Sequence, residues 1–131
     1  MLNIEFFCSL VRLNNRMDEM NFKECVEMIR SKDSMTYEDG YHWLQGHLDN
    51  HLDDLILLMQ RENDPSMRGR FLELIGDSKN PTVIPVLEVE LRNESSEVRS
   101  WAYSSLCYFE NPVAESLAMK FRAENPDEEF L

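Results

Sequence analysis

The sequence predicts an all-α fold, a short right-handed α-solenoid of stacked antiparallel helix pairs with about seven helices. The first observation is a 31-residue repeat, in which Lys79-Asn80-Pro81 returns as Glu110-Asn111-Pro112. The second is that apolar residues recur along the chain at the helical spacing i, i+3, i+4 and i+7. The third is that only 4 glycines and 5 prolines are present, which leaves few turns for strands. A fixed period in this range is typical of solenoids.

We expect the whole chain, 1–131, to form a single domain. Its parts in order are an N-terminal capping helix at 1–16, helix-pair repeats at 17–48, 49–78 and 79–109, a terminal helix at 110–124 and an acidic tail at 125–131. The first helices of the pairs are predicted from four apolar groups with helical spacing. These groups are Phe22, Cys25, Val26 and Ile29; Leu52, Leu55, Ile56 and Met59; Val83, Val86, Leu87 and Leu91; and Leu117 with Phe121.

The second helices are predicted at 65–77 and 96–109, where capping residues precede apolar spacing. Asn63-Asp64-Pro65 supplies a cap followed by proline in the first turn, and Ser95-Ser96-Glu97 supplies the other cap. Asn80-Pro81 and Asn111-Pro112 begin the helices that follow in the same way. One period earlier, Thr36, Gly40, Trp43 and Leu44 continue the pattern in a degenerate form.

Several residues of the 31-residue repeat match the sequence pattern of a known family of helical repeats. They are Asp64-Pro65 with Met67-Arg68, Phe71 and Ile75, then Glu97-Val98-Arg99 with Ala102 and Leu106, and the segment IPVLEVEL at 84–91. With them, residues 63–122 resemble HEAT repeats, whereas the likeness over 17–62 is weak. Phe71 stands where the family usually has a small residue, and Gly69 and Tyr103 are atypical. The resemblance implies a scaffold or binding module far more often than an enzyme, and it implies that Arg68 and Arg99 tie neighbouring helix pairs together.

The charge of the chain bears on its partners. With 13 basic and 25 acidic side chains the net charge is −12, which opposes nucleic-acid binding and favours a basic protein partner. The same acidity is also consistent with a role in solubility alone. By type, without any shared motif, a small acidic chain of this kind is similar to bacterial immunity proteins that neutralise nuclease toxins.

The expected function is therefore a non-catalytic protein-binding module, most concretely an immunity protein that neutralises a basic, nuclease-type toxin. The alternative is a HEAT-type adaptor or assembly subunit of a larger complex, and a remote alternative is a HEAT-fold nucleic-acid enzyme. The three cysteines, Cys8, Cys25 and Cys107, form no disulfide or zinc pattern, so a cytoplasmic location is expected. Neither a signal peptide nor a membrane-spanning segment is expected.

The candidate binding face comes from the predicted second helices. If Met67, Phe71, Leu74 and Ile75 point inward, the outward positions are Gly69, Glu73, Gly76 and Asp77, then Ser100, Ser104, Cys107 and Tyr108 one period later, and Glu38, His42, Gln45 and Gly46 one period earlier. The flanking positions are Asp39, Arg70 and Trp101. The predicted partner-binding residues are His42, Arg70, Glu73, Asp77, Trp101, Ser104 and Tyr108. The alternative is that this face is simply solvated and that Trp101 belongs partly to the core.

Catalytic residues, metals and cofactors are not expected. His47 and His51 have a spacing that can bind zinc together with Asp54, but Asp49-Asn50 is expected to interrupt the helix between the two histidines. Helix-cap polar residues are therefore the favoured interpretation. The acidic pairs Asp53-Asp54 and Glu128-Glu129 are interpreted as solvated charge runs.

Overall fold

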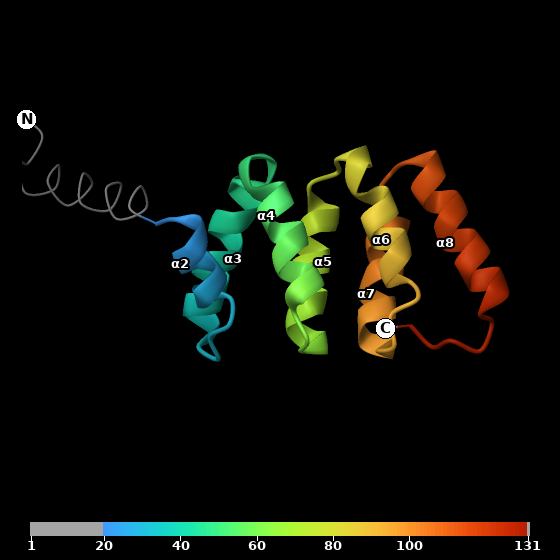
Figure 1. Ribbon diagram of the computed structural model, residues 1–131, viewed down its shortest axis with the longest axis horizontal. Coiled ribbons are helices and arrows are strands. Elements are labelled where there is room, and N and C mark those ends of the chain that lie inside the picture. Colours follow the sequence, from blue (N-terminus) through green and yellow to red (C-terminus); the bar gives the residue numbers. More distant parts are fainter. Residues whose placement is uncertain (1–19, 131) are drawn as a thin grey trace, which may run out of the picture. The chain divides into compact units, whose positions relative to one another are not determined.

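The computed structural model describes residues 20–130, and the regular secondary structure in this range is entirely helical. It contains seven α-helices, one short 3-10 helix and no strand, which confirms the all-α class for these residues (Figure 1). The elements are α2 (Phe22–Met28), α3 (Ser34–Gly46), α4 (Leu48–Arg61), α5 (Pro65–Asp77), η1 (Pro81–Val83), α6 (Ile84–Glu90), α7 (Ser96–Cys107) and α8 (Pro112–Glu124). The capping helix predicted at 1–16 lies outside the described residues.

The chain divides into two compact units, the first ending at Gly46 and the second beginning at His47. The expectation of one continuous domain with a right-handed solenoid path stays a prediction. In the first unit, α2 packs against α3. The Asn21 side chain caps α2 by accepting a hydrogen bond from the Glu24 backbone N–H at 2.9 Å. Cys25 of α2 is fully buried in this contact, and burial, with a smaller contribution from Glu24, raises the pKa of its thiol to about 11.

The helix starts in the second unit follow the capping residues seen in the sequence. The Asp64 carboxylate accepts from the Met67 backbone N–H at 3.0 Å, and Pro65 opens α5. The Ser95 hydroxyl caps α7, and the Asn111 side chain caps α8. Each cap satisfies backbone donors that the first helical turn leaves unpaired. The predicted second helix at 65–77 is therefore confirmed, and α7 begins at the predicted Ser96 but ends at Cys107, before the predicted residue 109.

The core of the second unit is centred on α5 and α7, which pack against each other. Helix α5 also contacts α4, and α7 also contacts α6 and α8 (Figure 1). The fully buried side chains include Leu55, Met59, Phe71, Leu72, Leu74, Ile75, Val83, Leu87, Ala102, Leu106 and Ala114. Because α5 has neighbours on two sides, it is buried over most of its circumference, and its glycines are buried as well.

Two arginines, one repeat apart, connect consecutive segments of this unit. Arg68 forms a two-pronged ion pair with Glu90 of α6, with donor–acceptor distances of 2.6 and 2.8 Å. The same guanidinium donates to the backbone carbonyl of Glu62, just as Arg99 donates to the carbonyl of Asn93. The Glu90 carboxylate is the main cause of a raised pKa at Arg68. The expectation that these arginines tie neighbouring helix pairs together is confirmed for Arg68, which joins α5 to α6, whereas Arg99 binds the segment that follows α8.

The C-terminal segment after α8 folds back on the helices. Glu128 accepts hydrogen bonds from Arg99 at 2.8 and 2.9 Å, and only 17% of its side chain is exposed. The ring of Phe130 stacks on Tyr103, with centroids 4.4 Å apart, and lies 5.6 Å from the ring of Phe121. The interpretation of Glu128 as part of a solvated charge run is therefore wrong. It failed because the partner, Arg99, is 29 residues away in the sequence.

The turns that follow α5 and α7 share an unusual backbone conformation. Lys79 has φ 53° and Glu110, one period later, has φ 60°, and both values lie in the left-handed region. This region favours glycine, since a side chain there crowds the backbone. The two turns are therefore related by geometry as well as by the Asn-Pro sequence that follows each of them.

Helix α4 contains a kink at His51, whose backbone is not helical (φ −128°, ψ 15°). The interruption expected near Asp49-Asn50 is therefore present one residue later. His51 lies 3.8 Å from the Asp54 carboxylate, and His47 is the N-cap residue of α4.

Among residues 20–130, no group of three or more histidine, cysteine or acidic side chains is placed to hold a metal ion. None of the helices described here combines the length and apolar character needed to cross a lipid bilayer.

Candidate functional site

A groove runs between α5 and α7 on the second unit. We call it the α5–α7 groove, and it is lined by Glu73, Gly76, Asp77, Lys79, Trp101, Ser104, Ser105 and Tyr108. Its volume is about 330 Å³, at the lower end of the range of small ligand pockets. The α7 residues have spacing i, i+3, i+4 and i+7, so they form one stripe of that helix. The groove is therefore built by facing stripes of two packed helices.

Small residues form the floor of the groove because the two helices approach closely there. A Cβ atom added at Gly76 would lie 2.9 Å from the Cβ of Ser105. A Cβ atom at Gly69, two turns earlier on α5, would overlap the Cδ1 atom of Trp101. Glycine at position 69 thus allows the indole of Trp101 to lie directly on the backbone of α5. Each close approach excludes a larger side chain at that position, and at Gly76 and Ser105 this keeps the floor of the groove free of larger side chains.

Aromatic side chains stand at both ends of the α7 stripe. Trp101 is half-buried against Gly69, whereas Tyr108 is 76% exposed. The two residues are seven positions apart, which corresponds to about 10 Å along a helix axis. Aromatic residues that combine rigid apolar area with a polar tip are enriched at protein interfaces.

Charged groups of both signs surround the groove. Glu73 and Asp77 lie one turn apart on α5, and each already has an interaction within the chain. The ammonium group of Lys79 donates a hydrogen bond to the backbone carbonyl of Tyr108 and lies 5.8 Å from the centre of the Phe109 ring. The ammonium group of Lys79 therefore lies at the end of the groove near Tyr108, whereas the carboxylates of Glu73 and Asp77 lie on the side formed by α5.

The predicted partner-binding residues divide into two sets. Five of them, Glu73, Asp77, Trp101, Ser104 and Tyr108, line the α5–α7 groove together. Arg70 lies half-buried on α5 and is not among the lining residues, and His42 lies exposed on α3 in the first unit. Gly76, one of the expected outward positions, also lines the groove, and Lys79 and Ser105, which were not identified from the sequence, complete the lining. Ser105 follows a predicted outward position, and Lys79 precedes the repeated Asn-Pro pair, so a weak signal existed for each.

Three positions predicted to face outward are buried instead. Gly69, Gly76 and Ser100 are all inaccessible or nearly so. The prediction was wrong because it assumed that the second helices bury a single face. In the structure α7 packs directly onto the side of α5 that carries the two glycines. Gly69 and Gly76 therefore mark the contact between α5 and α7.

The chemistry available in the groove is suited to binding. Its described lining contains carboxylates, hydroxyls and aromatic rings, and no histidine or cysteine. Cys107 is exposed next to this stripe, and its hydrogen bond with Tyr103 is the first cause of a raised pKa at that tyrosine. Hydroxyl and carboxylate oxygens accept hydrogen bonds, and the indole and phenol groups offer flat apolar surface.

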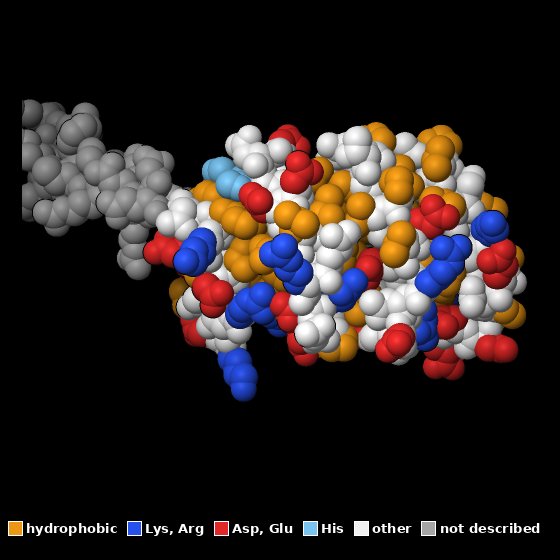
Figure 2. Space-filling view, in the orientation of Figure 1, with side chains coloured by type: hydrophobic (Ala, Val, Ile, Leu, Met, Phe, Trp, Pro, Cys, Tyr) orange, Lys and Arg blue, Asp and Glu red, His pale blue; other side chains and the backbone are white. Residues whose placement is uncertain are grey.

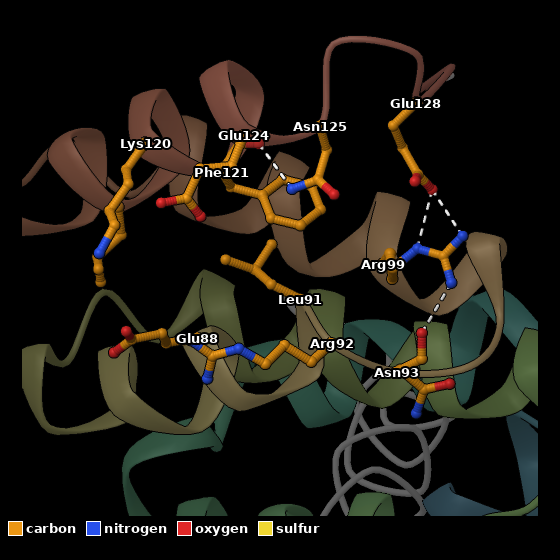
Figure 3. Close-up of a pocket in the computed structure, with 11 residues that line it drawn as sticks. Glu88, Leu91, Arg92, Asn93, Arg99, Lys120, Phe121, Glu124, Asn125 and Glu128 are labelled. Atoms are coloured by element: carbon orange, nitrogen blue, oxygen red, sulfur yellow. Dashed lines mark hydrogen bonds and ion pairs between the residues drawn. The ribbon is translucent and has the colours of Figure 1, made fainter.

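A second cavity of about 560 Å³ lies between α6, α8 and the C-terminal segment (Figure 3). Leu91 and Phe121 supply its apolar part, and the ion pair between Arg99 and Glu128 closes one end. Its remaining charged residues are Glu88, Arg92, Lys120 and Glu124. Basic and acidic groups are balanced in this second cavity, so it presents no charge of one sign.

The outer surface of the second unit also carries exposed apolar side chains. They include Val89 on α6 and Val113 and Met119 on α8. Figure 2 shows hydrophobic side chains over these two helices, together with Lys and Arg side chains scattered among Asp and Glu. This surface is mixed in charge, and the second cavity lies between the same two helices.

Comparison with known proteins adds no further assignment to these residues. The geometry of the α5–α7 groove therefore carries the functional argument. No protein-family model, no curated protein and no solved structure matches this chain.

Proposed function

We propose that this chain is a non-catalytic protein-binding module and that the α5–α7 groove is where its partner docks. The observation that carries the proposal is the grouping of Trp101 and Tyr108 with Glu73 and Asp77 around one hollow. Aromatic anchors beside desolvated polar groups are typical of the residues that dominate interface energy. A HEAT-like solenoid that presents its second helices to a partner is the architecture we propose for the whole chain.

The partner we propose is a basic protein. The net charge of −12 gives the chain a negative field that accelerates association with a positively charged surface. The two carboxylates on the α5 wall would then face basic side chains at the interface. An interface of ordinary size buries about 800 Å² on each partner, so contacts beyond the groove itself are part of the proposal.

The most concrete form of this function is an immunity protein in the cytoplasm that neutralises a basic, nuclease-type toxin. Such a toxin needs a positively charged cleft to hold its nucleic acid, because affinity for phosphates comes from lysine and arginine. An acidic surface with aromatic anchors can cover that cleft. The alternative role, an adaptor or assembly subunit, would use the same groove for a structural partner. The remote alternative, a HEAT-fold nucleic-acid enzyme, would require a basic groove, whereas this one holds two carboxylates and one lysine.

The proposal is tested by capture of partners from the native cell with wild-type protein and with a Trp101→Ala/Tyr108→Ala double variant. The matched control is Val89→Ala/Met119→Ala, which removes exposed apolar side chains from α6 and α8. Circular dichroism establishes that each bait is folded. The partner is identified by mass spectrometry, and its affinity is then measured with purified components.

We expect the groove variant to lose the partner and the control to retain it. Truncation of interface anchors costs at least 1–2 kcal/mol each by general experience, which is about 5- to 30-fold in affinity. A captured nuclease that loses activity on binding would support the immunity role, whereas a stable complex without inhibition would favour the adaptor. Equal binding by the groove variant and wild type would rule out the groove as the site.

A further inference from the structure

We infer that the α5–α7 groove is a receptor for an arginine side chain of the partner. This inference rests on the proposed function and makes it more specific. The guanidinium group would lie in the hollow beside the carboxylates of Glu73 and Asp77, with the aromatic side chains of Trp101 and Tyr108 on either side. The occupant is thus one arginine, presented by a basic protein surface.

The shape of the hollow suits a long side chain that ends in a flat group. Its floor is made of Gly76, Ser104 and Ser105, and the close contact between Gly76 and Ser105 keeps the floor free of larger groups. The two aromatic residues are about 10 Å apart along α7, which leaves room between them for an inserted side chain. The volume of about 330 Å³ is small for a peptide segment but ample for one side chain.

The hydrogen-bonding groups of the groove are complementary to a guanidinium. Arginine has five N–H donors and no acceptor, and the groove offers carboxylate oxygens from α5 and hydroxyl oxygens from Ser104 and Ser105. Glu73 and Asp77 already take part in interactions within the chain, but a carboxylate has about four lone-pair sites and can accept a further donor. Hydrogen bonds between ionised partners are about twice as strong as neutral ones.

The aromatic residues favour arginine over lysine. A planar guanidinium stacks on aromatic faces and is weakly hydrated, whereas an ammonium is a compact and strongly hydrated charge. The chain's own lysine in the groove, Lys79, directs its ammonium to the Tyr108 carbonyl. Its charge therefore lies at the Tyr108 end and opposes a second cation there. The space next to Trp101 and the α5 carboxylates is the more favourable place for the arginine.

The test uses isotope-labelled full-length protein and short capped peptides in an NMR titration. The probes are acetyl-Gly-Arg-Gly-amide, the same peptide with lysine, and the same peptide with citrulline, which keeps the shape of arginine but lacks its charge. We expect the arginine peptide to shift the amide signals of Gly76 and Ser104 and the indole N–H signal of Trp101. We expect the lysine and citrulline peptides to bind at least about fivefold more weakly.

Matched variants separate the groove from the general charge of the protein. The Glu73→Gln/Asp77→Asn variant should weaken the arginine peptide by about fivefold or more. The Asp53→Asn/Asp54→Asn variant removes the same charge from α4, outside the lining of the groove, and should change the affinity by less than about twofold.

The outcomes distinguish this inference from the proposed function. If the three peptides bind equally, or if the shifts map away from α5 and α7, the arginine receptor is refuted. The groove could then still be the docking site, as judged by loss of the captured protein partner in the Trp101→Ala/Tyr108→Ala variant. If the arginine peptide binds as expected while that variant keeps its protein partner, the receptor exists but the proposed docking site is wrong.

Discussion

The ion pair between Arg68 and Glu90 gives the sharpest prediction about stability. Only 18% of the Arg68 side chain and 6% of the Glu90 side chain are exposed, so both charges are largely removed from water. The change Arg68→Met removes the cation and leaves Glu90 with one remaining side-chain hydrogen bond, from Asn93 at 3.2 Å. A buried charge without its partner costs about 3–5 kcal/mol. Small domains have only about 5–15 kcal/mol of stability, so this variant should be near the limit of folding.

The corresponding change at the other arginine provides an internal control. Arg99 and Glu128 are more exposed, at 23% and 17%, so water can replace more of the lost interaction. We expect Arg99→Met to cost only about 1 kcal/mol, in the range of partly solvated pairs. Urea denaturation followed by circular dichroism at 222 nm measures both values. Similar small costs for the two arginines would show that Glu90 is hydrated in solution and would refute the reasoning.

A double variant distinguishes the effect of the unpaired Glu90 charge from the effect of lost side-chain packing. In Arg68→Met/Glu90→Leu both charges are replaced by apolar groups, and stability should return to within about 1–2 kcal/mol of wild type.

Two further substitutions and two measurements on the wild-type protein test the core, the helix contact and the cysteines. Phe71→Asp should abolish the cooperative melt, because a carboxylate in this fully buried site costs several kcal/mol, and a wild-type melt would show that the position is not buried. Gly69→Ala should shift the indole N–H signal of Trp101 in NMR spectra and cost about 1–3 kcal/mol from overpacking; an unmoved signal would contradict the contact. Of the two described cysteines, Cys107 should react with iodoacetamide at about pH 8, whereas Cys25 should be protected, as peptide mapping would reveal. Since the thiol pKa of Cys25 rises from 9.0 to about 11 on folding, stability should fall as pH increases across that interval, and a flat profile would count against its burial.

Much of the helical framework was predictable because its signals are local. Asp64, Ser95 and Asn111 act as caps within three residues of the groups they bind, so the sequence alone predicts where α5, α7 and α8 begin. The 31-residue spacing also related Arg68 to Arg99 before their partners were known. Repeats make such inference easier, since the same local pattern is observed more than once.

The remainder depended on contacts between residues far apart in sequence. Gly69 accommodates Trp101, and Gly76 meets Ser105, across two different helices. A helical wheel drawn for α5 alone has no information about the helix that packs on its other side, so it placed both glycines outside. Glu128 was misassigned for the same reason, because a carboxylate in an acidic run looks solvated until its distant arginine is known.

The left-handed turns at Lys79 and Glu110 have a consequence for how such a repeat can change over evolution. Neither residue is glycine, yet both adopt a conformation that costs a non-glycine residue about 1–3 kcal/mol. Lys79 and Glu110 differ in charge but share this conformation. The packing of the repeat therefore determines the turn, and the identity of the residue at this position does not. Lys79 uses its side chain to hold the next repeat through the Tyr108 carbonyl, whereas Glu110 is exposed. Replacement of Glu110 by glycine needs one nucleotide change and would relieve this cost. The stability gained could offset a destabilising change in the α5–α7 groove.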